Sequence, residues 1–574
     1  MNRAAPGRRG AVATQVAAAR AAAALAVALA VAGAASSAAA SQASAQRGPA
    51  SAAPAAEAAA TTPCRIAGLR NAVRCGVLKR ALDPARPDGP KIDLHYAVVP
   101  AIARRKLPDP VFVLAGGPGQ SAIDVAPMMM ALLNRLGNRR DIVFVDQRGT
   151  GRSAPLQCKG PGHESLADQV DPERQAVRLQ RCRAELLSSR HIGSADDLRF
   201  FTTTLAMQDL DAVRQALGAP RINLVGASYG TRAALEYQRQ FPARLRRSVI
   251  DGIAPPDMVL PASFAVDGQA AFDSMLAACD AEPACKARRP TLRADWAALL
   301  QRLPQTVRVA DPLTGRPETL VLTRDVLMGA VRGPLYHPAL ASALPVAVAA
   351  AARGEFAPLI GLASALGSQR GGAVALGMHF SVICAEDMPL LERAAAGSGA
   401  AKLANNAGVA ASTQATGLGS ATAASATAAA ATATATATSI VAADSGDASL
   451  SLYRRVCADW PRGAVPAAFY TVPASAVPVL LLSGGLDPAT PPRHGERVAQ
   501  ALGALARHVI VPHAGHGVMG LGCVRDVVFR FIDAVDERDA LAVDAACATG
   551  IPRPPTFQPI GVGDSQPAQP GPPR

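Results

Sequence analysis

The feature that most constrains the fold is a short apolar run, residues 222–225, that leads directly into residues 226–230, Gly-Ala-Ser-Tyr-Gly. A helical pattern follows at residues 233–241 and stops at Pro242. A buried strand, a tight glycine-bounded turn and a helix in immediate succession are typical of a crossover in a parallel sheet. The sequence therefore predicts an α/β architecture in which Ser228 lies at the carboxyl end of a strand.

Five further apolar runs predict the rest of this sheet. They lie at residues 111–114, 141–145, 249–252, 477–482 and 508–511, and a helix-like segment occupies 207–217. Strands that alternate with helices predict a mostly parallel, doubly wound sheet. From about residue 255 to 391 the chain is rich in Ala and Leu and has few strand signals. This stretch predicts a mainly helical cap inserted between two halves of one sheet.

Composition divides the chain into five expected parts. They are a signal peptide at 1–45, the first half of the core at 46–254, the cap at 255–450, the second half of the core at 451–550 and a disordered Pro-rich tail at 551–574. Within the cap, residues 394–446 are largely Ala, Thr and Ser, which bury too little apolar surface to offset the entropy of ordering them. We predict a disordered loop there, with an Ala-rich helix over part of it as the alternative.

The N-terminus has the features of an export signal. Arginines precede an apolar run at 21–35, and residues 43–45, Ala-Ser-Ala, offer a cleavage site before Gln46. The run is short and weak for a membrane-spanning helix, so we expect a secreted or periplasmic protein without stable membrane insertion after cleavage. An uncleaved anchor is the alternative. The arginine pair at positions 8 and 9 leaves twin-arginine export open beside the general route.

The ten cysteines agree with export, because an even number in an exported chain favours disulfides. None forms a Cys-x-x-Cys or Cys/His cluster with zinc-ligand spacing, so we expect neither a metal nor another cofactor. Sequence does not fix the connectivity, but joining neighbours gives the simplest set. That set is 64–75, 158–182, 279–285, 384–457 and 523–547.

The net charge of +14 raises the question of an anionic partner. Several of the arginines lie in the expected signal peptide, and no basic run is interleaved with aromatic residues, which make up only 4% of the chain. Nucleic-acid-binding proteins usually concentrate their positive charge on one face. We therefore expect no nucleic-acid partner.

Residues 226–230 also match Gly-x-Ser-x-Gly, the nucleophile elbow. The serine of such an elbow lies on a tight, strained turn, and side chains at Gly226 and Gly230 would collide with neighbouring elements. A chance glycine-rich turn is the alternative in a chain with 49 glycines, but the flanking strand and helix argue against it. The motif predicts an α/β-hydrolase fold with Ser228 as the nucleophile.

A serine nucleophile needs a base and an acid, and the order Ser, Asp, His along the chain selects the candidates. His516 follows the last predicted strand, and its glycine neighbours permit the close approach that a base requires. His513 competes for this role. Asp487 lies in the loop after the strand at 477–482, where it would hold the imidazole tautomer. Its alternative role is to cap the following helix.

An oxyanion hole needs backbone N–H groups directed at the developing negative charge. The residue after the nucleophile, Tyr229, is expected to supply one of them. The other is expected from Gly116 and Gly117, in the Gly-Gly-Pro-Gly loop at 116–119 that follows the strand at 111–114. A plain turn is the alternative for this loop.

Three glycine-containing motifs stand out: Gly-Gly-Pro-Gly at 116–119, Asp-Gln-Arg-Gly-Thr-Gly-Arg-Ser at 146–153 and Gly-Ala-Ser-Tyr-Gly-Thr at 226–231. Together they resemble the secreted tripeptidyl aminopeptidases, which are relatives of the prolyl aminopeptidases among the α/β hydrolases. Residues 478–516, with Gly-Gly-Leu-Asp-Pro-Ala-Thr-Pro from 484, resemble the C-terminal domain of that group. The likeness extends from about residue 64 to 547, interrupted by the Ala/Thr-rich tract.

The resemblance implies a serine exopeptidase that releases short N-terminal fragments, tripeptides by analogy with the group, through an acyl-enzyme. Its substrates would be peptides with a free N-terminus, whose ammonium group calls for carboxylates near the cleft. By family analogy, Glu386 and Asp387 are the candidates, and a solvated pair is their alternative reading. Ala115 stands where prolyl aminopeptidases carry a His, which favours the tripeptidyl group.

Two other functions fit the same residues. A carboxylesterase uses the same triad on the same fold, and the fold does not choose between ester and peptide substrates. A catalytically silent binding protein with this fold is the second alternative, and the joint presence of Ser228, Asp487 and His516 argues against it.

Overall fold

The computed structural model describes residues 61–158, 164–367, 373–395 and 448–559. The expected signal peptide, nearly all of the predicted loop at 394–446 and the end of the predicted tail lie outside these ranges. The described part contains a nine-stranded sheet in the order β1-β2-β3-β5-β4-β6-β7-β10-β11. Its strands are β1 (Thr62–Cys64), β2 (Val73–Ala81), β3 (Lys91–Val99), β4 (Val111–Leu114), β5 (Ile142–Val145), β6 (Ile222–Ala227), β7 (Leu245–Asp251), β10 (Val479–Gly484) and β11 (Ala506–Val511).

The predicted mostly parallel sheet is confirmed. All six apolar runs form strands, and every neighbouring pair from β5 to β11 is parallel. Strands β1 to β3 were not predicted, and they extend the sheet at one edge by antiparallel pairing. Their signal was the alternation of buried Ile92, Leu94 and Tyr96 along β3, which is typical of a strand with one covered face.

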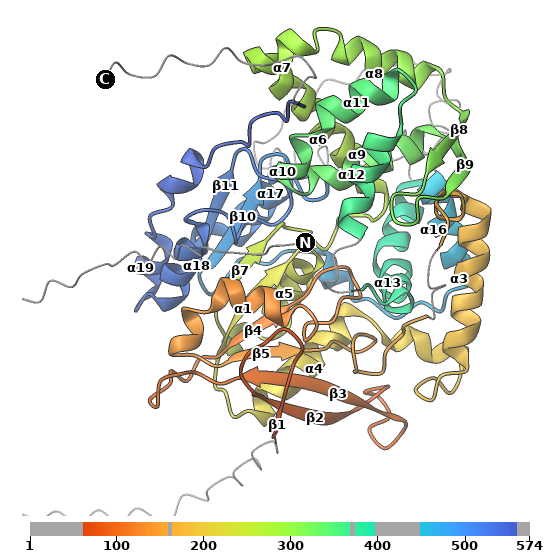
Figure 1. Cartoon of the computed structure of the whole chain (residues 1–574). Helices are drawn as coiled ribbons and strands as arrows, with labels where there is room; N and C mark the ends of the chain where they lie inside the picture. Colours follow the sequence, from red (N-terminus) through yellow and green to blue (C-terminus); the bar gives the residue numbers. More distant parts are fainter. Residues whose placement is uncertain (1–60, 159–163, 368–372, 396–447, 560–574) are drawn as a thin grey trace, which may run out of the picture. The chain divides into compact units, whose positions relative to one another are not determined.

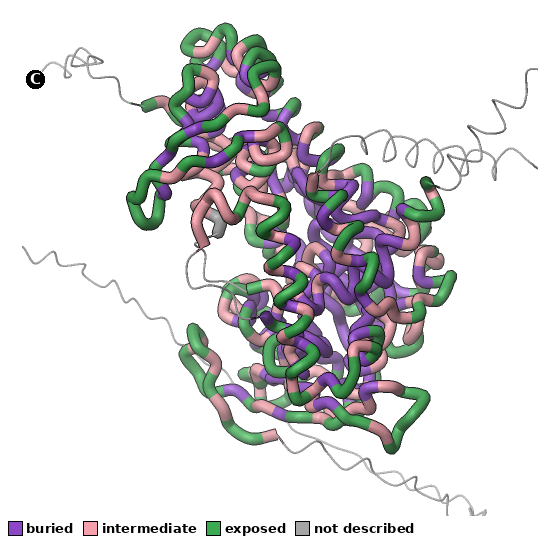
Figure 2. The backbone as a smooth tube through the Cα atoms, turned by 90° about the vertical axis from the view of Figure 1, so that its right-hand side faces the viewer, coloured by how far each residue is buried: buried purple, intermediate pink, exposed green. Residues whose placement is uncertain are grey.

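Helices cover both faces of the sheet because successive strand residues point to opposite sides. In β4, Val111 and Val113 pack on the face of helices α1 (Ala126–Leu133) and α18 (Val524–Asp533). Phe112 and Leu114 pack on the other face, with the second group of helices. That group is α4 (Thr203–Ala216), α5 (Tyr229–Gln240) and α17 (Pro492–Leu502). Figure 2 shows buried residues concentrated along these central elements.

A mainly helical region follows β7, as predicted, and has a core of its own. Its elements are α6 (Ala262–Ala281), α7 (Pro283–Arg288), α8 (Leu292–Gln301), β8 (Gln305–Ala310), β9 (Pro317–Leu322), α9 (Arg324–Leu335), α10 (Pro338–Ala341), α11 (Leu344–Ala352) and α12 (Ala357–Gly367). We call this set the cap lobe; it is mostly green in Figure 1. Phe272 and Trp296 pack in its core with ring centroids 4.5 Å apart and ring planes tilted by 50°.

The hairpin of β8 and β9 within the cap lobe is a departure from the expected helical pattern. The two strands pair antiparallel, and buried Val307 and Val309 face the same core as Leu320 and Leu322. This alternation of apolar and polar residues was the signal for the hairpin, but it is only six residues long on each side.

A further set of helices, separate from those that cover the sheet, joins the cap lobe to the core. It consists of α2 (Leu166–Val170), α3 (Pro172–Leu187), α13 (Leu376–Val382), a π-helical turn (Ile383–Asp387) and α16 (Ala448–Ala458). Apart from α2, these elements share one apolar cluster, which includes Met378, Phe380 and Trp460. The apolar side chains of α2 pack instead against the core of the cap lobe. The cluster also contains Tyr229, so these helices pack directly against the start of α5.

All five predicted disulfides are present, and the pairing of sequence neighbours is confirmed. They join Cys64–Cys75, Cys158–Cys182, Cys279–Cys285, Cys384–Cys457 and Cys523–Cys547. The bond between Cys384 and Cys457 spans 73 residues of sequence and links the π-helical turn to α16.

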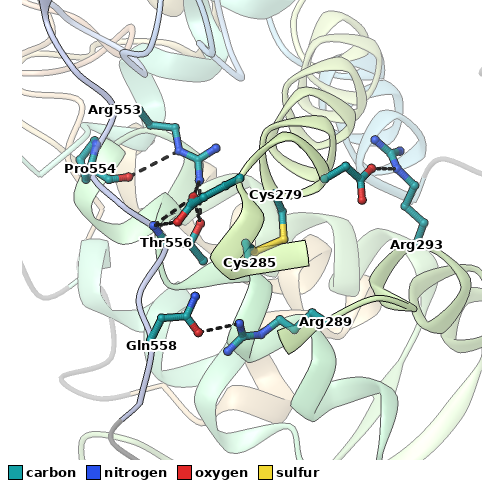
Figure 3. The surroundings of a disulfide bond; sticks show 10 residues. Cys279, Cys285, Arg289, Arg293, Arg553, Pro554, Thr556 and Gln558 are labelled. Carbon is teal, nitrogen blue, oxygen red and sulfur yellow. Dashed lines mark hydrogen bonds and ion pairs between the residues drawn. A yellow bond between two sulfur atoms is a disulfide. The ribbon is translucent and has the colours of Figure 1, made fainter. Parts of the chain in front are cut away.

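The first part of the predicted tail is not free but lies against the cap lobe. Near the disulfide between α6 and α7, Glu282 accepts hydrogen bonds from Arg553 Nη2 at 2.9 Å and from the Thr556 hydroxyl at 2.6 Å (Figure 3). Arg289 donates to Gln558 on the same segment. A composition rich in proline did not reveal these contacts, because they depend on side chains that lie about 270 residues away in sequence.

Candidate active site

Ser228 occupies the N-cap position of α5, and its backbone has φ of 55° and ψ of −124°. This left-handed backbone is strained for a residue with a Cβ, and its surroundings maintain it. A Cβ at Gly226 would lie 2.4 Å from the carbonyl oxygen of Gly230, and one at Gly230 would lie 2.3 Å from that of Leu114. The two glycines of the motif therefore permit the close packing that the sharp turn requires, as expected.

The elbow lies at the carboxyl edge of the sheet, beside the end of β7. Ala227 pairs with Asp251 in the register of β6 and β7, and the Ser228 N–H donates to the Asp251 carbonyl at 2.9 Å. Gly252, which directly follows the last residue of β7, has φ of +69°. A Cβ there would lie 2.9 Å from His516 Cε1, so the imidazole packs against the backbone that adjoins the elbow.

Asp487 and His516 follow the two neighbouring strands, β10 and β11, and they are in direct contact. The distance from His516 Nδ1 to Asp487 Oδ2 is 2.8 Å. Asp487 also accepts the N–H groups of Ala489 and Thr490 and the Thr490 hydroxyl, each at 2.8 Å. A carboxylate with this many donors has the strength to hold the imidazole in one tautomer and orientation.

Charge and burial act in opposite directions on this pair. Burial raises the pKa of Asp487, but His516 and the backbone N–H groups of Thr490 and Ala489 lower it by more, so the pKa lies below its ordinary value. Burial lowers the pKa of His516, while the Asp487 carboxylate raises it by more, and the result is a raised pKa. The pair therefore stabilises an imidazolium that forms when His516 takes a proton. His513, three residues earlier, is exposed.

A third carboxylate, Asp251, supports the same loops and was missed. Its side chain accepts hydrogen bonds from the N–H groups of Val518 and Met519, two residues that follow His516 closely. Burial raises the pKa of Asp251 to about 6. Asp251 thus links the elbow, through its carbonyl, to the histidine loop, through its carboxylate. Its sequence signal was its position at the end of a predicted strand next to the elbow strand.

The glycine loop predicted to form part of the oxyanion hole adjoins the elbow. A Cβ at Gly116 would lie 3.2 Å from the Cβ of Ser228. Gly117 has φ of +111°, a conformation that glycine adopts without strain. Asp146, the first residue of the motif at 146–153, accepts a hydrogen bond from the Ser121 hydroxyl at 2.6 Å. This bond fixes the chain just after the glycine loop. Tyr229, the other predicted donor, is buried as the first residue of α5.

Comparison with known families agrees with the topology of the sheet and the elbow. Residues 109–324 match the family described as alpha/beta hydrolase fold, and residues 443–540 match the family described as TAP-like protein. The chain has the α/β-hydrolase fold. The resemblance of the second half of this hydrolase to tripeptidyl aminopeptidases is confirmed by the second match.

Curated relatives of this hydrolase carry peptidase names. It is 28% identical over 301 residues to serine protease Hip1 of Mycobacterium tuberculosis, covering 49% of this chain and 56% of that protein. It is 30% identical over 196 residues to tripeptidyl aminopeptidase of Streptomyces lividans, covering 33% and 36%. It is 31% identical over 165 residues to proline iminopeptidase aneH of Aspergillus aculeatus, covering 27% and 31%. The hydrolase thus spans about half, or less, of the length of these relatives.

The two acids predicted to bind a substrate ammonium are buried, with 1% and 0% of their surface exposed. Asp387 forms an ion pair with Arg232 of α5 at 2.8 Å and accepts the Leu260 N–H. Glu386 accepts the N–H of Thr203 at 2.8 Å and lies 3.6 Å from Arg232. Both carboxylates therefore face protein partners, and their role toward a substrate stays a prediction.

Burial dominates the electrostatics of these two acids. It raises the pKa of Glu386 to about 7 and also raises that of Asp387, against the opposing effect of Arg232. The Thr203 hydroxyl bridges Glu386 to the Tyr229 hydroxyl, at 3.0 Å and 2.6 Å. The network therefore fixes the first turns of α5, which begins at the elbow. Arg232 was missed in the sequence because an arginine four residues after the serine resembles an ordinary helix-surface residue.

A cavity of about 680 Å³ lies between the cap lobe and α16, away from these residues. None of the three predicted triad residues lines it. Within the described ranges, no group of three His, Cys, Asp or Glu side chains is placed to hold a metal ion. No helix in the same part of the chain has both the length and the apolar character needed to cross a membrane.

Proposed function

We propose that this hydrolase is a serine exopeptidase that releases short N-terminal fragments, tripeptides in the first instance, from peptides with a free N-terminus. The observation that carries the proposal is the strained Ser228 next to Gly252, whose backbone contacts the imidazole of the hydrogen-bonded Asp487–His516 pair. Backbone of this kind persists where surrounding structure enforces it, and it is concentrated at active sites. The TAP-like match at residues 443–540 supports the choice of a peptide substrate.

The proposed reaction follows from the direction of the hydrogen bonds. Because Asp487 accepts from Nδ1–H, the imidazole of His516 keeps its Nε2 lone pair free to take the proton of the Ser228 hydroxyl. The Ser228 oxygen then attacks the scissile carbonyl, and the N–H groups of Tyr229 and of the 116–117 backbone stabilise the resulting oxyanion. His516 returns the proton to the leaving amine, and water hydrolyses the acyl-enzyme by the same route.

The experiment is a comparison of N-terminally free and blocked di- and tripeptide chromogenic substrates, with ester substrates of the same acyl groups. We expect kcat/KM to be highest for free tripeptides and to fall sharply when the amine is acylated. The matched variant is Ser228→Ala, which should abolish turnover and also labelling by a serine-reactive phosphonate.

Each possible result separates the candidate functions. Equal rates on free and blocked peptides would contradict an exopeptidase, and preference for uncharged esters would identify a carboxylesterase. Absence of both turnover and phosphonate labelling in the native chain would favour a binding protein instead. Labelling that persists in Ser228→Ala would reject Ser228 as the nucleophile.

We further propose that the hydrolase acts outside the cytoplasm. Five disulfides support this location, because such bonds persist in oxidising compartments and are rare in the cytosol. The signal peptide predicted at residues 1–45 would direct the export.

A further inference from the structure

The glycine loop beside Ser228 is contacted from α13 and the residues just before it. The Ala375 N–H donates to the carbonyl of Gly119 at 2.9 Å. A Cβ at Gly119 would lie 2.8 Å from the Ala375 carbonyl, so the two backbones are in close contact. One turn further along α13, His379 Nδ1 lies 3.3 Å from the carbonyl oxygen of Pro118. The loop therefore has two adjacent hydrogen bonds to a segment that is distant from it in sequence.

The partners of His379 determine which of its nitrogens carries the proton. A carbonyl oxygen only accepts, so Nδ1 must donate to Pro118. Nε2 lies 2.8 Å from the hydroxyl of Tyr453, and in the neutral ring it accepts from that hydroxyl. Burial lowers the pKa of His379 to about 4, which agrees with a neutral ring that donates on one side and accepts on the other.

The imidazole of His379 is held in place by a rigid frame. Tyr453 belongs to α16, and the Cys384–Cys457 disulfide fixes α16 to the chain that follows α13. The Tyr453 ring meets that of His379 edge to face at a centroid distance of 5.7 Å, and Phe380 packs 5.0 Å from Tyr453. A side chain enclosed in this way can orient a neighbouring backbone, because its own freedom is already restricted.

We propose that His379 is a positioning residue that orients the oxyanion loop through its hydrogen bond to the carbonyl of Pro118. The inference rests on the proposed function, since it assigns His379 a role in the same reaction. The Pro118 carbonyl belongs to the peptide unit that also carries the Gly119 N–H. Loss of its hydrogen bond would let this unit shift and displace the adjoining residues 116 and 117, whose N–H groups are expected to face the oxyanion. None of the contacts of His379 described above involves Ser228 or His516.

Two conservative variants separate the two sides of the ring. In His379→Asn, the amide nitrogen can take the place of Nδ1 and donate to Pro118, but the bond to Tyr453 is lost. In His379→Gln, the amide oxygen can take the place of Nε2 and accept from Tyr453, but the donor to Pro118 is lost. Both replace the ring by an amide, so their effects on packing are comparable. Tyr453→Phe removes the hydroxyl alone.

We expect His379→Gln to lower kcat about 10- to 100-fold with KM nearly unchanged, because a misplaced oxyanion donor affects the transition state more than the bound substrate. His379→Asn should keep kcat within a few-fold of the native value, and Tyr453→Phe should lie between them. The affinity for a boronic acid, which forms a tetrahedral adduct with serine, should fall in parallel with kcat. Inhibition by the product peptide should not change.

Equal losses of kcat in the Asn and Gln variants would overturn the inference, as would a rise in KM with kcat preserved. A loss that follows the melting temperature across the three variants, with no change in relative boronate affinity, would show a structural role only. These results differ from a failure of the proposed function, in which the native chain itself neither turns over the free tripeptides nor reacts with the phosphonate.

Discussion

Two pairs of polar residues that the sequence predicted as site residues differ in their surroundings. Asp487 and His516 lie at the carboxyl edge of the sheet, where the imidazole keeps 14% of its side-chain surface exposed. Glu386 and Asp387 lie in the π-helical turn, where both side chains are buried and share the single positive charge of Arg232. We propose that the first pair exchanges a proton in the reaction, whereas the second joins the π-helical turn to α5 through the ion pair of Asp387 with Arg232.

The pKa shifts express the same difference. Asp487 stays ionised because its partners outweigh its burial, so its pKa is lowered. Glu386 has fewer donors, and burial raises its pKa to about 7. A buried acid with a raised pKa is also a candidate for function in general, because active sites use such shifts. The two pairs therefore need variants that separate a loss of chemistry from a loss of stability.

The largest expected effect comes from the base at the sheet edge. His516→Ala should lower kcat about 10⁶-fold, because a serine nucleophile without its base keeps only the contribution of the oxyanion hole and substrate binding. His513→Ala is the matched control, three residues away in the same loop and exposed, and should stay within about two-fold. Steady-state rates of both variants on the best free tripeptide substrate provide the test. Similar losses in both would show that the loop, not the imidazole of His516, matters.

The sequence was sufficient for the sheet edge because its chemistry depends on local signals. Each of Ser228, Asp487 and His516 follows an apolar run and lies among glycines, and parallel strands bring such loops to one edge. The glycines at 226 and 230 are required by contacts between backbones, whereas Gly252 lies against the side chains of His516 and Thr490.

The sequence was not sufficient for the partners of these residues. Asp387 with Arg232, and His379 with Pro118, are pairs separated by 155 and 261 residues, and neither member carries a local pattern. The contact of Thr556 with Glu282 was missed for the same reason, because the two residues are 274 positions apart. The β8–β9 hairpin did carry a local signal, but its alternation is only six residues long on each side. Sequence reasoning identified the acids at 386 and 387 by family resemblance, but only the structure gives their internal ion pair.

A second prediction compares the two aspartates directly. Asp487→Asn should lower kcat about 10⁴-fold, since the amide cannot hold the imidazole tautomer. Asp387→Asn should instead leave Arg232 buried with a weakened partner and destabilise the fold by about 3 kcal/mol, with a smaller change in kcat. Chemical denaturation and steady-state rates, measured on both variants, provide the comparison. A full loss of activity in a stably folded Asp387→Asn variant would instead support the role in substrate binding.

The pH profile of Asp487→Asn sharpens this comparison. His516 acts as a base only when neutral, so activity should fall as the pH drops through its pKa. That pKa is raised by Asp487, and the acid limb of kcat/KM should therefore lie above the ordinary value of about 6.5 in the native enzyme. The neutral amide removes this effect, so the acid limb should move to lower pH. An unchanged limb in the variant would mean that another group controls the titration.

The smallest effect tests whether the sheet edge depends on contact with the imidazole or only on its strained backbone. Gly252 and Gly218 have nearly equal φ values of +69° and +67°, so an alanine at either should cost about 1–2 kcal/mol of stability. A Cβ at Gly218 meets open space, whereas one at Gly252 would lie 2.9 Å from His516 Cε1. Gly252→Ala should therefore displace the imidazole and lower kcat about 10-fold or more, while Gly218→Ala should leave kcat unchanged. If the two variants lose stability equally and keep equal rates, the imidazole tolerates displacement, and the packing of Gly252 against it does not set the geometry of the base.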